Sequence, residues 1–348
     1  METVEFAPGY AISRLIRGGW QLAGGHGPID RDQAVAHLVA AFDAGVTTFD
    51  CADIYTGVEE LYGAFCARVR ALRGEEAARA MRVHTKLVPD LASLKTLRRA
   101  DVEAIVDRSL RRLRVERLDL VQFHWWDFAA PGYLEALSWL DALRRAGKVL
   151  LVGGTNFDGS HVREILAAGV PLASMQVQYS VLDRRPAGGL AELCRAHGVA
   201  LLCYGTAAGG FLSDRWLGAP EPEAPQNRSL VKYKLIIDDF GGWTLFQELL
   251  RALRNVADRH GADIASVATR LALDFPGVAA AIVGATSQRH LTANVAAVGL
   301  PLTDADRAEV EAVAAKARGP SGEVYALERD RHGRHGAIMK YDLNAEVA

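Results

Sequence analysis

Short apolar runs rich in β-branched residues alternate along this chain with longer segments of helical periodicity. Near-continuous apolar runs are typical of parallel strands that are buried on both faces. A first, weaker run covers Ile12–Ile16, and seven stronger runs follow it. The seven predict strands at Val46–Asp50, Met81–Lys86, Leu118–His124, Val149–Gly153, Ala173–Gln178, Val199–Tyr204 and Val278–Val283.

Helical patterns fill the gaps between these runs. Asp30 is a suitable N-cap for a helix whose apolar residues recur at helical spacing from Ala34 to Phe42, and Gly45 follows as a stop signal. Similar patterns predict helices at Asp101–Leu113, Tyr133–Ala146, Ser160–Ala168, Gly189–His197, Thr244–His260 and Ala265–Leu273. Strand–helix alternation of this kind indicates a parallel sheet with helical crossovers. Eight such units in about 300 residues favour an α/β fold of the (β/α)₈ TIM-barrel type over a doubly wound open sheet.

Two regions fall outside this regular alternation. Thr206–Gly242 is a long insertion after the seventh strand; it is rich in Gly and Pro and carries Trp216 and Tyr233. A long loop in a compact domain is usually a lid or a binding loop. The charged, His-bearing tail from Gly319 either borders the active site or is partly disordered. The sequence therefore predicts one barrel domain over residues 1–318 and a C-terminal tail over residues 319–348.

Charge and composition narrow the functional class. The formal net charge is -2, from 40 basic and 42 acidic residues, which does not favour a nucleic-acid or anionic-membrane partner. The four cysteines, at 51, 66, 194 and 203, form no CxxC pair and no zinc spacing, and are expected to be reduced and mostly buried. The N-terminus does not read as a signal peptide, and no window reaches about 18 apolar residues. These features predict a cytoplasmic enzyme without a metal.

Polar residues with catalytic potential stand where the predicted strands end. The second strand ends at Asp50, the third at Lys86 and the fourth at His124, and Tyr55 lies five residues past Asp50. Chemistry in such a barrel takes place at the C-terminal ends of the strands. Taken singly, each residue has a structural explanation as a helix cap, a solvent-reaching lysine or a packed histidine. Their convergence on one rim favours a functional explanation.

These four side chains suit proton transfer to a carbonyl oxygen. A tyrosine has an ordinary pKa of about 10, so it needs help to give up its proton near neutral pH. An adjacent ammonium favours the phenolate, and a carboxylate behind the lysine keeps that lysine charged. A neutral histidine can orient the carbonyl by donating one hydrogen bond. The set lacks a reductant, so a hydride carrier is required.

Seven segments, in order, resemble the aldo-keto reductase family, and the resemblance runs from about Ile12 to Ala297. The segment FDCADIY (49–55) resembles the family's D-x-A-x-x-Y signature. The others are HTK (84–86), QFHWW (122–126), AGKVLLVGGTNF (146–157), MQVQYSVLDR (175–184), CYGTAAGGFL (203–212) and IVGATSQRHLTAN (282–294). The resemblance implies a (β/α)₈ barrel that binds NADP(H) in extended form over the strand ends.

The resemblance also implies a role for each catalytic residue. Tyr55 would be the general acid/base, Lys86 would lower its pKa, Asp50 would pair with Lys86, and His124 would orient the substrate. The substrate would be a small-molecule aldehyde, ketone or alcohol. Trp20, Trp125 and Trp126 are the aromatic candidates for the walls of its pocket.

The implied cofactor site is spread over several strand ends. Asn156 and Gln176 would hold the nicotinamide carboxamide, and Tyr204 would stack on the nicotinamide ring. Gly205 to Leu212 would follow the pyrophosphate, and Gly284 to Asn294 would hold the adenosine end. The complete implied set is Gly19, Trp20, Asn156, Gln176, Tyr204, Gly205, Thr206, Gly210, Leu212, Gly284, Thr286, Gln288, His290 and Asn294.

The chain departs from the family pattern at the adenosine end. Many members carry Lys-Ser where this chain has Gly284–Ala285, and Arg where it has His290. NADP(H) remains the first expectation, because Thr286, Ser287, Gln288 and Arg289 can still serve its 2′-phosphate, and NAD(H) is the alternative. The usual Ser-Pro-Leu after the stacking tyrosine is replaced by Gly205–Thr206–Ala207, which predicts a more mobile pyrophosphate loop.

Three other functions are alternatives to an NAD(P)(H)-dependent oxidoreductase. The first is a cofactor-binding regulatory protein on the same barrel, resembling the voltage-gated potassium channel β-subunits; the complete catalytic set favours the enzyme. A metal-dependent barrel hydrolase needs clustered His and carboxylate ligands, such as HxH on the first strand, and the sequence has none. A Rossmann dehydrogenase is disfavoured because no GxGxxG follows a predicted strand.

Overall fold

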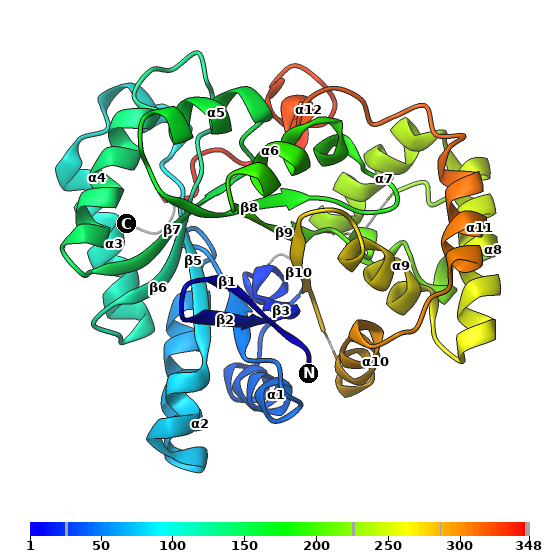
Figure 1. Cartoon of the computed structure of the whole chain (residues 1–348), viewed down its shortest axis with the longest axis horizontal. Coiled ribbons are helices and arrows are strands. Elements are labelled where there is room, and N and C mark those ends of the chain that lie inside the picture. The colour runs from blue at the N-terminus through cyan, green and yellow to red at the C-terminus, as the bar shows by residue number, and fades with distance from the viewer. Residues whose placement is uncertain (25–26, 225–226, 286, 345–348) are drawn as a thin grey trace.

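A closed barrel of eight parallel strands forms the centre of the computed structural model, which describes residues 1–24, 27–224, 227–285 and 287–344 (Figure 1). Around the barrel the strands follow one another in the order β10-β3-β4-β5-β6-β7-β8-β9. Their bounds are β3 (Leu15–Gly18), β4 (Thr48–Asp50), β5 (Arg82–Leu87), β6 (Leu118–Phe123), β7 (Val149–Thr155), β8 (Leu172–Gln178), β9 (Ala200–Tyr204) and β10 (Val278–Val283). The predicted (β/α)₈ barrel is confirmed, and the open sheet is excluded.

The weak first run proves to be two elements instead of one strand. Its first residues belong to β2 (Tyr10–Ser13), which pairs antiparallel with β1 (Thr3–Ala7), and its last belong to β3. Arg14 separates the two strands, and Ser13 Oγ at the end of β2 donates to the Leu15 carbonyl at 2.7 Å across this bend. Phe6 and Tyr10 of this hairpin pack with inward-facing barrel residues. The hairpin thereby fills the end of the barrel at which the strands begin.

The predicted helices are present around the barrel, with ends that shift by one or two residues, and the helices at Val58–Ala80, Asp304–Ala314 and Ala326–Arg329 are additional to the prediction. Asp30 caps α1 (Arg31–Asp43) by accepting from Gln33 N at 3.0 Å, as predicted. The remaining α-helices outside the insertion are α2 (Val58–Ala80), α3 (Arg99–Leu113), α4 (Tyr133–Arg145), α5 (Gly159–Ala167), α6 (Leu190–Ala196), α8 (Trp243–His260), α9 (Ile264–Leu273), α10 (Gln288–Val298), α11 (Asp304–Ala314) and α12 (Ala326–Arg329). Short 3₁₀ helices are η1 (Trp20–Leu22), η2 (Leu91–Thr96), η3 (Arg185–Gly188), η4 (Ala208–Gly210), η5 (Asp214–Trp216) and η6 (Gly336–Ile338).

The insertion after β9 is more ordered than the predicted loop. Its second half forms α7 (Arg228–Phe240), which buries Tyr233, Ile236, Ile237 and Phe240 on one face. The side chain of Asn227 caps this helix by accepting from Leu230 N at 2.9 Å. The Gly- and Pro-rich stretch before Asn227 hid this helix in the sequence, because such composition is typical of loops.

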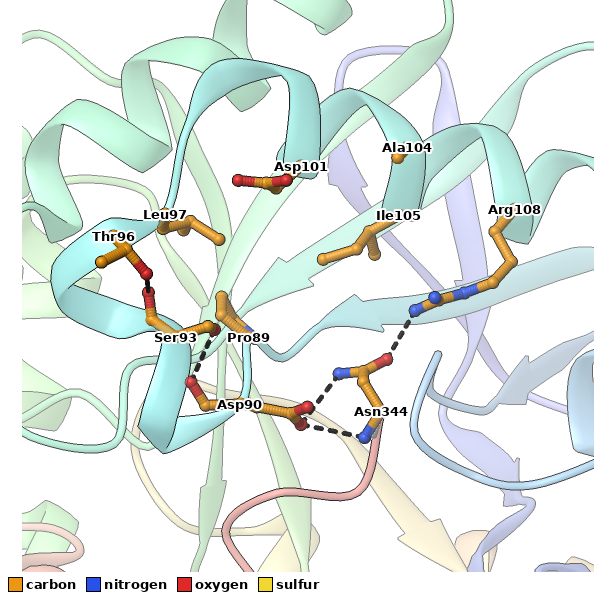
Figure 2. A pocket seen from close by; sticks show the side chains of 10 residues that line it. All are labelled: Pro89, Asp90, Ser93, Thr96, Leu97, Asp101, Ala104, Ile105, Arg108 and Asn344. Atoms are coloured by element: carbon orange, nitrogen blue, oxygen red, sulfur yellow. Dashed lines mark hydrogen bonds between the residues drawn. The ribbon is translucent and has the colours of Figure 1, made fainter. Parts of the chain in front are cut away.

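The C-terminal tail packs along the molecule as far as Asn344. Figure 1 shows it passing from α11 by way of α12 to the side of the barrel that carries α3. Asn344 anchors its end: Nδ2 donates to the Val88 carbonyl at 2.8 Å, and Oδ1 accepts from Arg108 Nη2 at 2.5 Å. Figure 2 shows this anchor beside a cavity of about 380 Å³ between η2 and α3. None of the predicted site residues lines that cavity.

Two sequence expectations concern the chain as a whole. All four cysteines are free and buried, as expected. Within residues 1–24, 27–224, 227–285 and 287–344, the structure contains no helix long and apolar enough to cross a membrane. The cytoplasmic location stays a prediction.

Candidate active site

The four predicted catalytic side chains come from adjacent strands and the loops that leave them. Asp50 is the last residue of β4, Lys86 lies near the end of β5, and His124 follows the last residue of β6. In the register of the barrel, Asp50 lies opposite His84, and Lys86 lies opposite Gln122. Because β4, β5 and β6 are parallel neighbours, their C-terminal ends meet on one rim. The strands therefore bring Asp50, Lys86 and His124 to the same part of that rim.

A buried ion pair lies at the centre of this group. Lys86 Nζ donates to Asp50 Oδ2 at 2.7 Å and to the Cys51 carbonyl at 2.8 Å. Only 6% of the Lys86 side chain and 5% of the Asp50 side chain are exposed. Burial pulls the pKa of Lys86 down, but the nearby Asp50 carboxylate outweighs it, and the pKa ends above its ordinary value. Lys86 therefore stays an ammonium at neutral pH.

Two glutamine amides hold the other oxygen of Asp50. Gln122 Nε2 donates to Asp50 Oδ1 at 3.0 Å, and Gln176 Nε2 donates to the same oxygen at 2.7 Å. Gln176 Nε2 also donates to Gln122 Oε1 at 3.0 Å. Sequence reasoning missed Gln122, although it lies two residues before His124 on the same strand. The period of two along a strand places such residues on one face, and this signal could have identified it.

Tyr55 lies in the loop after β4, close to the ion pair. Lys86 Nζ is 5.3 Å from the centroid of the Tyr55 ring, and the Trp20 ring centroid is 5.1 Å from it. Burial raises the pKa of Tyr55, the Lys86 charge lowers it, and the net direction is upward. Lys86 therefore lowers the pKa of Tyr55 as expected, but burial raises it by more. The general-acid/base role of Tyr55 remains a prediction.

His124 is a neutral imidazole with one unpartnered nitrogen. Its Nδ1 lies 3.1 Å from the Thr155 carbonyl oxygen, which can only accept, so Nδ1 carries the proton. Burial, reinforced by the charge of Arg329, lowers the pKa of His124 to about 3. In this tautomer Nε2 is a buried lone pair without a partner in the described residues. The structure therefore differs from the expectation that His124 donates to a carbonyl, because its one N–H is already used.

The three residues predicted to contact the nicotinamide, Asn156, Gln176 and Tyr204, lie near one another at the ends of β7, β8 and β9. Tyr204 ends β9, and its hydroxyl donates to Asn156 Oδ1 at 2.9 Å. The Asn156 backbone has φ of 62°, a left-handed conformation that Asn tolerates better than most residues. Both amide hydrogens of Gln176 are used within the barrel, so only its Oε1 can meet a carboxamide. Asn156 and Tyr204 are half-buried, which leaves part of each side chain accessible.

The opposite side of the rim carries Gly19 and Trp20. Gly19 N donates to the Asp50 carbonyl at 2.7 Å, and a Cβ at Gly19 would approach that same oxygen to 2.9 Å. This close approach explains the glycine. Trp20 Nε1 donates to Ser229 Oγ of α7 at 3.2 Å, and the guanidinium of Arg228 lies 5.3 Å from a Trp20 ring. The insertion thus reaches from β9 to the end of β3.

The loop after Tyr204 presents backbone to the rim. Gly205 and Gly210 have φ of 80° and 102°, which favour glycine. A Cβ at Gly205 would lie 2.4 Å from the Tyr233 hydroxyl. Thr206 is buried, with its hydroxyl 3.3 Å from that of Thr269, and Leu212 belongs to the core beneath α7. The side chains of Thr206 and Leu212 therefore serve packing, and only their backbone can face a ligand.

The adenosine-end residues lie at the start of α10. Gly284 is exposed, and its carbonyl accepts from Asn294 Nδ2 at 2.9 Å. Ser287 caps the helix, while Gln288, Arg289 and His290 are exposed in its first turn. Thr286 lies outside the described residues. Behind this turn, Arg17 Nη2 donates to the Ala285 carbonyl at 2.7 Å and fixes the loop from the barrel side.

Of the three tryptophans predicted to line the substrate pocket, Trp20 and Trp126 lie beside catalytic side chains and Trp125 does not. Trp125 is fully buried, and its Nε1 donates to the Ala130 carbonyl at 3.0 Å, so the structure does not bring it to the rim. Trp126 packs edge-on against His124, with ring centroids 4.3 Å apart. Tyr325 of the tail packs against the same imidazole at 5.5 Å. The sequence left open whether the tail borders the active site or is partly disordered, and it had no periodic signal from which to select Tyr325.

Metal ligands do not gather in the part of the chain that the structure describes. No group of three or more His, Cys, Asp or Glu residues there could hold a metal ion. The chemistry available at the rim is instead proton transfer through a phenol next to a buried ammonium, beside accessible aromatic and amide groups.

Comparison with known proteins gives a consistent result. A sequence model of the aldo/keto reductase family matches residues 14–315. The chain is 30% identical over 262 residues to flagellar radial spoke protein 5 of Chlamydomonas reinhardtii, covering 64% of this chain and 49% of that protein. It is 26% identical over 323 residues to the NADH-specific methylglyoxal reductase of Escherichia coli (strain K12), covering 85% of this chain and 92% of that protein. The chain thus spans about half of the first relative and nearly all of the second.

A solved structure shares the fold. A thermostable aldo-keto reductase crystallised with the inhibitor epalrestat superposes with a TM-score of 0.71 at 26% identity. The match covers 90% of this chain and 100% of that one.

Proposed function

Since this chain belongs to the aldo/keto reductase family, we propose that it is an oxidoreductase that reduces an aldehyde or ketone to an alcohol, or catalyses the reverse reaction, with a nicotinamide cofactor. The observation that supports this most is the buried Lys86–Asp50 pair at 2.7 Å beside the Tyr55 ring. A structural ion pair does not require a partly accessible phenol next to it. A proton-transfer site does.

In this proposal Tyr55 moves the proton. In the reductive direction its hydroxyl donates to the substrate oxygen while the carbonyl carbon receives a hydride. The phenolate that remains is stabilised by the Lys86 ammonium, which the Asp50 carboxylate holds in place. In the oxidative direction the phenolate takes the proton from the alcohol. Gln122 and Gln176 keep Asp50 aimed at Lys86, because they hold its second oxygen.

His124 acts as a hydrogen-bond acceptor. Its Nε2 lone pair can accept a hydrogen bond from another donor of the bound substrate, since its only N–H is bound to the Thr155 carbonyl. The hydrogen of the reacting hydroxyl goes to Tyr55. The carbonyl form depends on Tyr55 as its donor.

The residues around the rim fit a dinucleotide, which would supply or accept the hydride when bound. Tyr204 and Trp20 offer half-buried aromatic rings, Asn156 offers an amide, and the Gly205–Gly210 loop offers backbone without obstructing side chains. We assign the adenosine end to the first turn of α10. NADP(H) is the first choice, because Arg289 and His290 are exposed there and can meet a 2′-phosphate. NAD(H) is the alternative; one relative is named for NADH specificity.

A second candidate is a cofactor-binding regulatory or structural protein on the same barrel. The name of the radial spoke relative, at 30% identity, favours keeping it. The two candidates differ in turnover. Purified protein is incubated with NADPH or NADH and 4-nitrobenzaldehyde, and absorbance at the nicotinamide band is followed. The oxidoreductase predicts cofactor consumption that depends on the aldehyde. Tight cofactor binding without consumption, across a panel of carbonyls and alcohols, would support the regulatory protein.

A further inference from the structure

Arg329, in the part of the tail that packs over His124, has a guanidinium with hydrogen-bond donors that lack an acceptor among the described residues. We call Arg185, Lys232, Tyr325, Glu328 and Arg329 the roof cluster. Arg329 of α12 donates from Nη2 to the Asn156 carbonyl at 2.8 Å and to the Trp125 carbonyl at 3.1 Å. These bonds fix it against the segments that leave β6 and β7. Its Nε and Nη1 are buried and have no acceptor in the part of the chain that the structure describes. Buried donors without an acceptor are uncommon, and a ligand is one explanation for them.

Aromatic rings surround this charge. The guanidinium carbon lies 4.0 Å from the Phe128 ring centroid and 5.3 Å from the Tyr325 ring centroid. Burial lowers the pKa of Arg329 to about 10, so the group remains charged at neutral pH. A buried charge without an opposite charge is costly, and an anion at its free N–H groups would remove that cost.

The two buried carboxylates of this region, Asp183 and Glu328, already have positively charged partners. Arg185 donates from Nη2 to Asp183 Oδ2 at 2.7 Å and from Nη1 to Glu328 Oε2 at 3.0 Å. Lys232 Nζ lies 3.9 Å from Glu328 Oε1. Arg185, Lys232 and Arg329 therefore share two carboxylates, and one positive charge is left over. That excess belongs to Arg329, for which no described carboxylate lies within ion-pair distance.

One more carboxylate is near enough for its charge to reach Arg329. Asp158 raises the pKa of Arg329, but its Oδ1 is held by His161 Nδ1 at 2.7 Å and by Ser160 Oγ at 2.7 Å. Asp158 also caps α5 through His161 N. Its Oδ1 is thus used at the start of that helix, and neither oxygen lies within ion-pair distance of Arg329, whose Nε and Nη1 keep no acceptor in the described residues.

This charge lies close to the proposed reaction centre. The Tyr325 ring that packs against Arg329 also packs against His124, with ring centroids 5.5 Å apart. A second buried donor without an acceptor in the described residues is Nε1 of Trp126, whose ring also packs against His124. Both groups can only donate. The surroundings of the imidazole therefore favour a ligand that accepts hydrogen bonds and carries negative charge.

We propose that Arg329, assisted by Trp126 Nε1, recognises a carboxylate on the substrate, so that the carbonyl compound is an oxo acid or an aldehydic acid. The inference deepens the proposed function and rests on it. A carboxylate matches the site because it only accepts hydrogen bonds, and a charge-assisted bond to a guanidinium is stronger than a neutral one. Arg329 is then a specificity residue, contributed by the tail.

The test compares two substrates that share the benzaldehyde group, one with a charged carboxylate and one with its neutral methyl ester. Initial rates are measured for 4-carboxybenzaldehyde and for its methyl ester, with the cofactor that the enzyme uses. Wild type is compared with R329Q, with R329K, which retains the charge, and with the matched control R331Q. The Arg331 side chain is 53% exposed and is not part of the roof cluster. The readout is the ratio of kcat/KM for the acid to kcat/KM for the ester.

We expect wild type to favour the acid by about tenfold, mainly through KM, as one charge-assisted bond would give. The ratio should fall toward one in R329Q, recover in part in R329K and stay high in R331Q. A wild-type ratio at or below one with good turnover of the ester would overturn this inference and leave the oxidoreductase intact. A preference for the acid that is as large in R329Q as in wild type would also overturn this inference.

A binding experiment separates this inference from the proposed function. Benzoate titration, followed by the thermal midpoint of unfolding, needs no turnover. Stabilisation of wild type and R331Q but not of R329Q would support the carboxylate site even if no carbonyl compound were reduced. Equal stabilisation of all three proteins, or of none, would contradict it.

Discussion

At the scale of single residues, the charge of Lys86 determines how readily Tyr55 gives up its proton. Burial alone disfavours the phenolate, and the ammonium 5.3 Å from the ring opposes that effect. Asp50 keeps Lys86 charged and raises the pKa of Tyr55 slightly in return. The lysine and the carboxylate therefore act as one unit whose net effect on the phenol can be measured.

Replacing Lys86 by Met tests that unit. Without the ammonium the pKa of Tyr55 rises further, so the phenolate required for alcohol oxidation forms only at higher pH. We expect kcat for oxidation to fall by roughly 10²–10⁴ at neutral pH, the usual contribution of a positioned proton-transfer group. The rising limb of the pH–rate profile for oxidation should move to higher pH. The measurement is the pH dependence of alcohol oxidation, with K148M, a surface lysine paired with Asp107, as control. An unshifted limb in Lys86→Met would contradict the role assigned to Lys86.

At the scale of elements, α7 joins the insertion to the rim. Its buried face packs with η4 and α8, while Ser229 and Arg228 at its start contact Trp20. The helix thus closes one side of the candidate cofactor site. Its stability depends on apolar burial, because Gly242 follows it closely and only Asn227 caps its start.

Truncating the buried face of α7 should therefore destabilise the protein. Ile236 is fully buried, and Ile236→Ala is expected to lower the free energy of unfolding by about 2–5 kcal/mol, the range for large-to-small core substitutions. Leu72 of α2 is 45% exposed, and Leu72→Ala should change it by less than about 0.5 kcal/mol. Urea denaturation compares the two. Equal, small effects would mean that α7 does not pack as the structure shows.

The same elements show what the sequence could and could not predict. Apolar runs located every strand after the first, because buried parallel strands leave a direct hydrophobic signal. They failed at Ile12–Ile16, where one apolar run hides a bend at Arg14 that the Ser13–Leu15 hydrogen bond spans. The sequence also could not separate Trp125 from Trp126 as pocket candidates, since both are aromatic and only the packed structure distinguishes a core residue from a rim residue. Tyr325 and Arg329 had no periodic pattern to reveal them.

At the scale of the whole molecule, the tail ties distant parts of the barrel together. Glu328 accepts from Arg185 of η3 and lies near Lys232 of α7, and Asn344 is anchored to α3 and the loop after β5. Glu328 is 1% exposed, and its pKa is lowered to about 2: burial raises it, but the charges of Arg185 and Lys232 prevail. The roof over His124 thus depends on one buried carboxylate.

Removing the charge of Glu328 should lower the free energy of unfolding of the protein. Glu328→Gln leaves Arg185 and Lys232 with too little negative charge, and we expect a loss of about 3–5 kcal/mol in the free energy of unfolding at pH 7. Glu311 pairs with Arg184 at the surface, so Glu311→Gln should cost at most about 1 kcal/mol. Urea denaturation at several pH values measures both.

The effect of Glu328→Gln should also depend on pH. The folded-state pKa of Glu328 is depressed, so its contribution is complete above the ordinary value of 4.5 and is lost as the pH falls toward 2. The difference between wild type and Glu328→Gln should therefore narrow between pH 5 and pH 3. A difference that stays constant over this range would show that the carboxylate is not ion-paired in the folded protein.

The account as a whole depends on Tyr55 as the group that transfers the proton, and Tyr55→Phe tests this most directly. Single-turnover oxidation of bound reduced cofactor by an aldehyde is measured beside the cofactor dissociation constant in wild type, Tyr55→Phe and Tyr133→Phe; the Tyr133 hydroxyl bonds Glu164, away from the ion pair. The account predicts a rate at least about 10²-fold lower in Tyr55→Phe alone, with the dissociation constant nearly unchanged in all three proteins. A Tyr55→Phe protein that reacts at the wild-type rate, or that loses cofactor binding while keeping its chemistry, would contradict it.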